Sequence, residues 1–154
     1  MELQIRHTLA TLAYRAGKAL RDAPESFADF KASEKSRTPV QILAHMGDLF
    51  DWALSLAQGK QVWKDATPLP WDEEVSRFFR LLEAFDSHLA LGKTLDCRAD
   101  QLFQGPIADA LTHTGQLTFL RGMAEAPVRP ENYFKATIEA GRCGKEQVKP
   151  KMEF

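Results

Sequence analysis

Two histidines and one aspartate stand out in segments that otherwise have the apolar pattern of helices. Asp109 and His113 are four residues apart, so a helix would place both side chains on one face, one turn from each other. His45 lies within the most apolar segment of the chain. Imidazole and carboxylate groups are common ligands of divalent transition metals, and three protein ligands leave coordination positions open for water or substrate. These residues therefore form a candidate metal site.

The same residues also have an ordinary structural interpretation. A single histidine on an apolar helix is more often a hydrogen-bonded core residue than a ligand, and Asp and His four residues apart are common on solvated helix surfaces. Spacing alone therefore favours the structural interpretation. Two polar residues could orient the imidazoles, since Gln116 follows His113 at i+3 and Asp48 follows His45 at i+3. Asp48 would equally fit a solvent-facing position.

The chain has four histidines, so few residues can supply a metal site. His7 and His88 have no suitably spaced partner, and we expect them to be ordinary helix residues. Gly115 lies in the same segment as His113, where glycine costs about 1 kcal/mol relative to alanine unless the space is needed. Residues that could line a pocket beside the site are Tyr14, Trp52 and Phe119.

The first two predicted helices carry the clearest boundaries. One spans about residues 2–21, with apolar residues along two adjacent faces. The next begins with Thr38 as its N-cap, followed by Pro39 and by Gln41, which together match a capping box with proline at the first helical position. Gly59 is expected to end this helix.

Two further helices complete the predicted fold. Residues 60–71 read as a loop, after which Asp72 caps a helix that closes at Gly92. The last helix is expected to open at Gly105-Pro106 and to stop at Pro127. None of the segments has the sustained alternation of a strand. The sequence therefore predicts an all-α fold, an antiparallel four-helix bundle with an irregular C-terminal tail.

The length of 154 residues suits a single domain. We assign residues 1–127 to the bundle and residues 128–154 to a C-terminal extension, with one short helical turn at about 132–140. This extension is expected to pack back on the same domain through Phe134, Ile138 and Phe154, the alternative being a free, mildly basic tail.

Composition excludes several classes of partner. A net charge of −1 argues against nucleic-acid binding, which needs a concentrated basic surface. Charges interrupt the first 23 residues and the most apolar segment, so we expect neither a signal peptide nor a membrane span. Cys97 and Cys143 form no C-x-x-C pair, and a reducing, cytoplasmic location follows as the expectation.

Two segments resemble a known family. The segment from Asp109 to Arg121, DALTHTGQLTFLR, resembles the last-helix signature of the DinB/YfiT-like family of metal-binding four-helix bundles. The segment TPVQILAHMGDLFDW, residues 38–52, is similar to that family's second helix, and the resemblance extends over about residues 1–127. In that family one histidine of the second helix and two histidines of the last helix hold a divalent metal. By this pattern His45 and His113 fall on ligand positions, and Asp109 stands where the family usually has histidine.

The resemblance implies a metal-dependent enzyme, either a thiol-dependent transferase or a hydrolase. The expected cofactor is a divalent transition metal, zinc, nickel or iron, held by His45, Asp109 and His113 between the second and fourth helices. The expected substrate is a small molecule, with a low-molecular-weight thiol as the thiol donor, and family habit implies a homodimer. The alternative function is a non-catalytic bundle that serves as a metal-binding or dimerisation module, because Asp109 departs from the family pattern.

Overall fold

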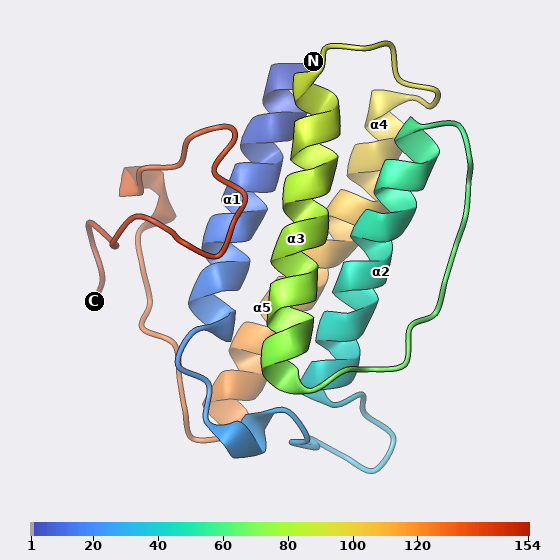
Figure 1. Cartoon of the computed structure of the whole chain (residues 1–154). Coiled ribbons are helices and arrows are strands. Elements are labelled where there is room, and N and C mark those ends of the chain that lie inside the picture. Colours follow the sequence, from blue (N-terminus) through green and yellow to red (C-terminus); the bar gives the residue numbers. More distant parts are fainter. Residues whose placement is uncertain (1) are drawn as a thin grey trace.

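The computed structural model describes residues 2–154, and within that range it contains helices and no strand. The four long helices are α1 (Glu2–Leu20), α2 (Pro39–Ala57), α3 (Trp71–Ala90) and α5 (Ala108–Met123) (Figure 1). The predicted all-helical class is confirmed. No helix in the described range combines the length and the apolar character needed to cross a lipid bilayer.

The helices pack as two antiparallel pairs. Arg6 near the start of α1 forms an ion pair with Asp86 near the end of α3, so these two helices run in opposite directions. Ile42 near the start of α2 shares a pocket with Leu120 near the end of α5, which makes this pair antiparallel as well. Figure 1 shows the same directions through its colours.

The two pairs, however, pack against each other in parallel. The ring of Phe50 on α2 contacts those of Phe78 and Phe85 on α3, and the carbonyl of Ala57 accepts a hydrogen bond from the backbone of Asp96, just after α3. In Figure 1, α2 and α3 both rise while α1 and α5 both descend. The antiparallel arrangement predicted from the sequence therefore holds within two helix pairs, and not between α2 and α3 or between α1 and α5, whose ends meet where Arg121 donates to the carbonyl of Ala19.

The connection of residues 58–70 explains this parallel pairing. Extended chain advances about 3.3–3.6 Å per residue and a helix about 1.5 Å, so a connection with roughly two-thirds of a helix's residues can return along its whole length. Two buried carboxylates hold the connection in place. Asp48 accepts a hydrogen bond from the backbone of Ala66, at 3.1 Å, and Glu74 accepts one from the backbone of Leu69, at 3.0 Å.

The predicted start of α2 is confirmed in detail. The Thr38 hydroxyl accepts the backbone N–H of Gln41, and the Gln41 side chain accepts the backbone N–H of Thr38 at 2.9 Å. This capping box fixes where the helical register of α2 begins, and with it the face on which His45 lies. Gly59 follows the helix with φ of 73°, a conformation that favours glycine.

The helix that carries Asp109 begins earlier than the sequence predicted. α4 (Ala99–Leu102) leads directly into a π-helical segment, η2 (Phe103–Ile107), and then into α5. The predicted start at Gly105-Pro106 is therefore wrong. Proline lacks the N–H that a regular α-helix would use, and the π turn accommodates Pro106 without ending the helix. The wider turn sets the rotation of α5 immediately before Asp109.

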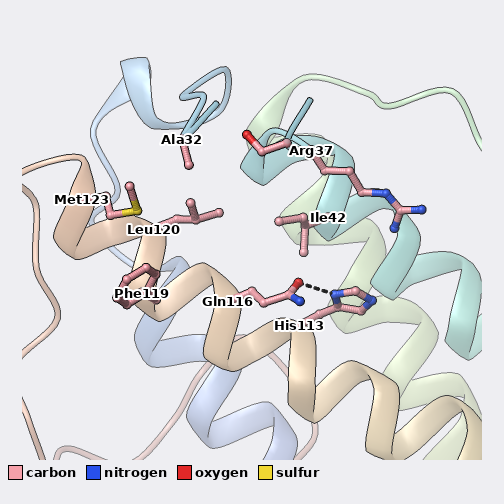
Figure 2. A pocket seen from close by; sticks show the side chains of 9 residues that line it. Ala32, Arg37, Ile42, His113, Gln116, Phe119, Leu120 and Met123 are labelled. Carbon is pink, nitrogen blue, oxygen red and sulfur yellow. Dashed lines mark hydrogen bonds between the residues drawn. The ribbon is translucent and has the colours of Figure 1, made fainter. Parts of the chain in front are cut away.

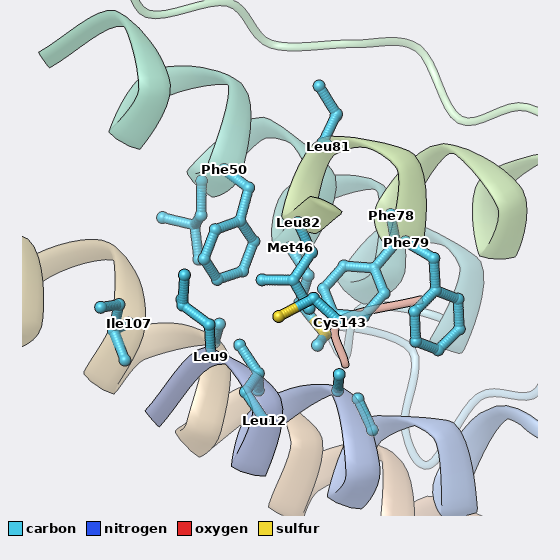
Figure 3. Close-up of a cluster of buried hydrophobic side chains, with 14 of the residues drawn as sticks. Leu9, Leu12, Met46, Phe50, Phe78, Phe79, Leu81, Leu82, Ile107 and Cys143 are labelled. Carbon is cyan, nitrogen blue, oxygen red and sulfur yellow. The ribbon is translucent and has the colours of Figure 1, made fainter. Parts of the chain in front are cut away.

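The core lies between the four long helices and is dominated by aliphatic and phenylalanine side chains (Figure 3). Its largest fully buried members include Leu9, Leu12, Met46, Phe50 and Phe78. Cys143 from the C-terminal extension packs against the same cluster and is 1% exposed. The core thus fixes α2 against α5, which is the interface that carries the predicted metal ligands.

The C-terminal extension contacts α1 through polar and aromatic groups. Glu131 accepts hydrogen bonds from the Tyr14 hydroxyl and from the Lys18 ammonium group, which lies 2.7 Å from Oε2. The predicted contacts of Phe134 and Phe154 are wrong, since these rings are 91% and 66% exposed. Ile138 is partly buried against the core, as expected. The helical turn predicted at 132–140 is shorter in the structure, where it is the 3-10 turn η3 (Tyr133–Lys135). A second 3-10 turn, η1 (Glu25–Phe27), lies between α1 and α2.

Candidate metal centre

α2 and α5 bring His45, Asp109 and His113 together. Nε2 of His45 lies 3.3 Å from Oδ2 of Asp109, and Nε2 of His113 lies 3.4 Å from Oδ1 of the same carboxylate. The two imidazole rings are perpendicular, with centroids 5.0 Å apart. One donor atom from each residue can be chosen so that all lie within 4.8 Å of one another. In the described part of the chain this is the single His, Cys, Asp or Glu group with such convergence.

Burial differs across the cluster. The His113 residue is 9% exposed, whereas the side chains of His45 and Asp109 are 22% and 46% exposed. The histidines thus form an inner wall and the carboxylate borders solvent. A bound ion would keep an accessible side, which a site that exchanges water or substrate needs.

The protonation of His113 follows from its second nitrogen. Nδ1 lies 2.7 Å from the amide oxygen of Gln116, and an amide oxygen only accepts, so Nδ1 carries the proton. In the neutral ring Nε2 then has a lone pair directed toward a carboxylate oxygen of Asp109. These two acceptors repel each other unless a proton or a cation lies between them.

The donor set fits a divalent transition metal. With metal–ligand bonds of about 2.1 Å, tetrahedral coordination separates neighbouring ligand atoms by about 3.4 Å. Both His–Asp separations, 3.3 and 3.4 Å, agree with this value. These two distances involve different oxygens of Asp109. When one donor atom is taken from each residue, all three lie within 4.8 Å of one another, so small side-chain rotations would bring them into one coordination shell.

Asp48 does not orient His45. Its carboxylate forms an ion pair with Arg77 and accepts the backbone N–H of Ala66, and it is 4% exposed. Asp48 was predicted to be a partner of His45, but its contacts are with Arg77 and Ala66. Asp48 lies on the side of α2 that faces α3, where its carboxylate binds Arg77 and the backbone of Ala66 in the connection of residues 58–70.

Two aromatic residues form a wall beside His45. The indole of Trp63, from the connection of residues 58–70, lies edge-on to the His45 ring with centroids 5.7 Å apart, and Trp52 lies edge-on to Trp63 at the same separation. Trp52 thus borders the site as predicted, but Trp63 was missed, because a tryptophan within a loop carries no periodic signal. The one available signal is the residue type itself, a large aromatic within a loop.

Tyr14 lies away from the site. Its hydroxyl donates to Glu131, and burial together with this bond raises the pKa of the phenol. Tyr14 therefore contacts the C-terminal extension and, contrary to the prediction, does not line a pocket beside the site. His7 is exposed and His88 is half-buried, and neither belongs to the cluster.

Hollows open on both sides of the cluster. One, of about 450 Å³, is bordered by His113 and Gln116 and continues along α5 past Phe119 (Figure 2). The other, of about 390 Å³, is bordered by Asp109 and Trp52. Both volumes are within the range of ligand-binding pockets in proteins, about 300–1,000 Å³.

Comparison with known proteins adds no relative: no protein-family model, no curated protein sequence and no solved structure matches this chain.

Proposed function

We propose that this chain is a metal-dependent enzyme of the DinB/YfiT-like type, a thiol-dependent transferase or a hydrolase acting on a small molecule. The ligands would be His45 on α2 with Asp109 and His113 on α5. The observation that carries the proposal is the meeting of two imidazole nitrogens with one carboxylate, 3.3 and 3.4 Å away, between two helices. The resemblance of residues 38–52 and 109–121 to the family's metal-binding segments supports the same ligand set and a four-helix bundle of that family.

The chain's own groups prepare the site in three ways. Gln116 holds the His113 ring so that Nε2 faces the other donors. Asp109 supplies one negative charge to offset a divalent cation, and its exposed side leaves the site accessible. Trp63 lies edge-on to the His45 ring and borders that side of the site. A divalent metal held here would supply the Lewis acidity that transferases and hydrolases of this type require.

Metal analysis of protein purified without a histidine tag tests the proposal. We expect about one equivalent of zinc, nickel or iron per chain, and its loss in His45→Ala and in His113→Ala. His7→Ala is the matched control, because it removes an exposed imidazole outside the cluster. Stoichiometric metal that survives both ligand substitutions would contradict the site assignment.

A second candidate function is a non-catalytic module for metal binding or dimerisation. It is favoured by one observation, that Asp109 occupies the position at which the resemblance implies histidine. Absence of bound metal after reconstitution with each of the three ions, in protein whose helical circular dichroism is intact, would favour a dimerisation module over the metal-dependent enzyme.

A further inference from the structure

The pocket beside His113 has a strongly uneven lining. It lies between α2, the connection that precedes it and α5, and its volume is about 450 Å³. Ile42 and Leu120 form its apolar floor. Phe119 and Met123, at 70% and 45% exposure, leave further apolar surface at one end. Large apolar side chains left open to water around a cavity are typical of a ligand-binding surface.

The polar groups of this pocket gather at the other end. In Figure 2 the guanidinium of Arg37 and the imidazole of His113 lie toward one side, and Phe119 and Met123 toward the other. The oxygen of Gln116 is engaged with His113, which leaves its amide N–H groups as donors. The polar end therefore offers donors and a positive charge, and no carboxylate lines the pocket.

Arg37 has no acidic partner in the described part of the chain. The ion pairs found there involve other arginines, such as Arg6 with Asp86 and Arg77 with Asp48, and none includes Arg37. A guanidinium beside an apolar cavity can bind a carboxylate with two parallel hydrogen bonds. Charge complementarity therefore favours an anionic group at this end of the pocket.

We propose that this pocket binds an amphipathic carboxylate, with its apolar part on Ile42, Leu120 and Met123 and its carboxylate at Arg37. This names a substrate class for the site, and it rests on the proposed function only in placing the ligand's polar end next to His113. Binding itself requires the pocket and not the metal, because His45 and Asp109 do not line it.

Octanoate is a suitable probe, with octanamide as its uncharged counterpart. We expect saturable binding of octanoate at millimolar concentration, followed by NMR shifts of Ile42, Gln116 and Leu120. Arg37→Gln should weaken octanoate binding about five- to tenfold and leave octanamide binding unchanged, because only the carboxylate uses the charge. Lys35→Gln is the matched control, since it removes a cation of the same connection that does not line the pocket.

The apolar end has its own matched pair of variants. Met123 and Met152 are both 45% exposed, and Met123 alone lines this pocket. Met123→Glu places a carboxylate where the ligand's chain would lie and should abolish octanoate binding, whereas Met152→Glu should preserve it. The proposal would be overturned if Arg37→Gln and Met123→Glu both bound octanoate with the affinity of the wild-type protein. It would also be overturned if octanoate shifted the NMR signal of no pocket residue.

A metal-free sample separates this proposal from the function proposed above. We expect octanoate to bind in the presence of a chelator and to His45→Ala protein. Absence of metal binding by the wild-type protein, with octanoate binding intact, would refute the metal site and leave the pocket proposal standing. Metal binding by the wild-type protein without octanoate binding would refute the pocket proposal and leave the metal site standing.

Discussion

The amide oxygen of Gln116 lies 2.7 Å from Nδ1 of His113, less than one turn further along α5. This contact fixes the tautomer of the imidazole and turns Nε2 toward Asp109, 3.4 Å away. His113 is 9% exposed, so water competes little for either nitrogen. A local i+3 pair thus directs the more buried of the two imidazoles to the point where α2 and α5 approach each other.

Removal of this contact should weaken metal binding without unfolding the protein. Loss of a hydrogen bond that orients a metal-binding histidine typically lowers affinity 10–100-fold, and we expect a decrease of that size for Zn²⁺ in Gln116→Ala. Gln116→Glu keeps an oxygen acceptor and should retain affinity close to that of the wild type. Competition with a chromophoric chelator measures the dissociation constants.

The exposed Gln101→Ala serves as the control for Gln116→Ala. If Gln116→Ala binds Zn²⁺ as tightly as the Gln101→Ala protein, the Gln116 side chain has no part in orienting His113.

The parts of the site that could be predicted are those that depend on helical periodicity. Asp109 and His113 share a face because they are four residues apart, and the capping box at Thr38 fixes the register that places His45. These local rules act within a single helix, so the sequence carries them directly. The meeting of His45 with α5 depends on packing between helices, and the family resemblance supplied it as an expectation.

The parts that could not be predicted depend on contacts between distant segments. The parallel pairing of α2 and α3 requires the connection of residues 58–70 to run back along the helices. No local sequence pattern predicts the path of this connection. The same path explains both the aromatic contact of Trp63 with His45 and the engagement of Asp48 by Ala66. The start of the last helix was predicted too late because Pro106 lies within a π turn, which has no distinct sequence pattern.

Two glycines of the helices should respond in opposite directions to alanine. At Gly47 a Cβ would lie 2.7 Å from Nη1 of Arg77, which is held by Asp48 and by the carbonyl of Ala44. We expect Gly47→Ala to lower the free energy of unfolding by about 1–2 kcal/mol, since overpacking outweighs the gain in helix propensity. Urea unfolding followed by circular dichroism measures the change.

Gly115 supplies the contrast. A Cβ there meets no atom within 4 Å, so none of the chain's own atoms needs the space that this glycine leaves. Gly115→Ala should raise the free energy of unfolding by up to about 1 kcal/mol through helix propensity alone. Destabilisation of both variants by similar amounts would show that the space around Gly47 is not what distinguishes them.

The buried thiol of Cys143 should make stability depend on alkaline pH. Burial, together with the negative charge of Asp86, raises the pKa of this thiol from 9.0 to about 12. Between these values the folded protein binds more protons than the unfolded chain, so the free energy of unfolding falls as pH rises above 9. The contribution of Cys143 is fully present below pH 9.

The slope due to one thiol is at most about 1.4 kcal/mol per pH unit. Denaturant unfolding between pH 8 and 10 should therefore show a shallower decrease in Cys143→Ala than in the wild type. Cys97 is half-buried with a smaller rise of its pKa, so Cys97→Ala should change the slope less. Identical slopes in the wild type and in Cys143→Ala would mean that this thiol titrates alike in the folded and unfolded chain.

The carboxylate of Asp109 is the one charged donor between the two imidazoles of the candidate metal site. Asp109→Asn keeps the size of the side chain and removes the negative charge that offsets a divalent cation. We expect Zn²⁺ affinity to fall at least tenfold, since an amide is a much weaker zinc ligand than a carboxylate. Asp109→His restores the three-histidine set that the family resemblance implies and should retain high Zn²⁺ affinity. The exposed Asp100→Asn is the control for a general loss of negative charge. If Asp109→Asn and Asp100→Asn bind Zn²⁺ equally well, Asp109 is not a ligand, and the two histidines would need a further donor from water or substrate.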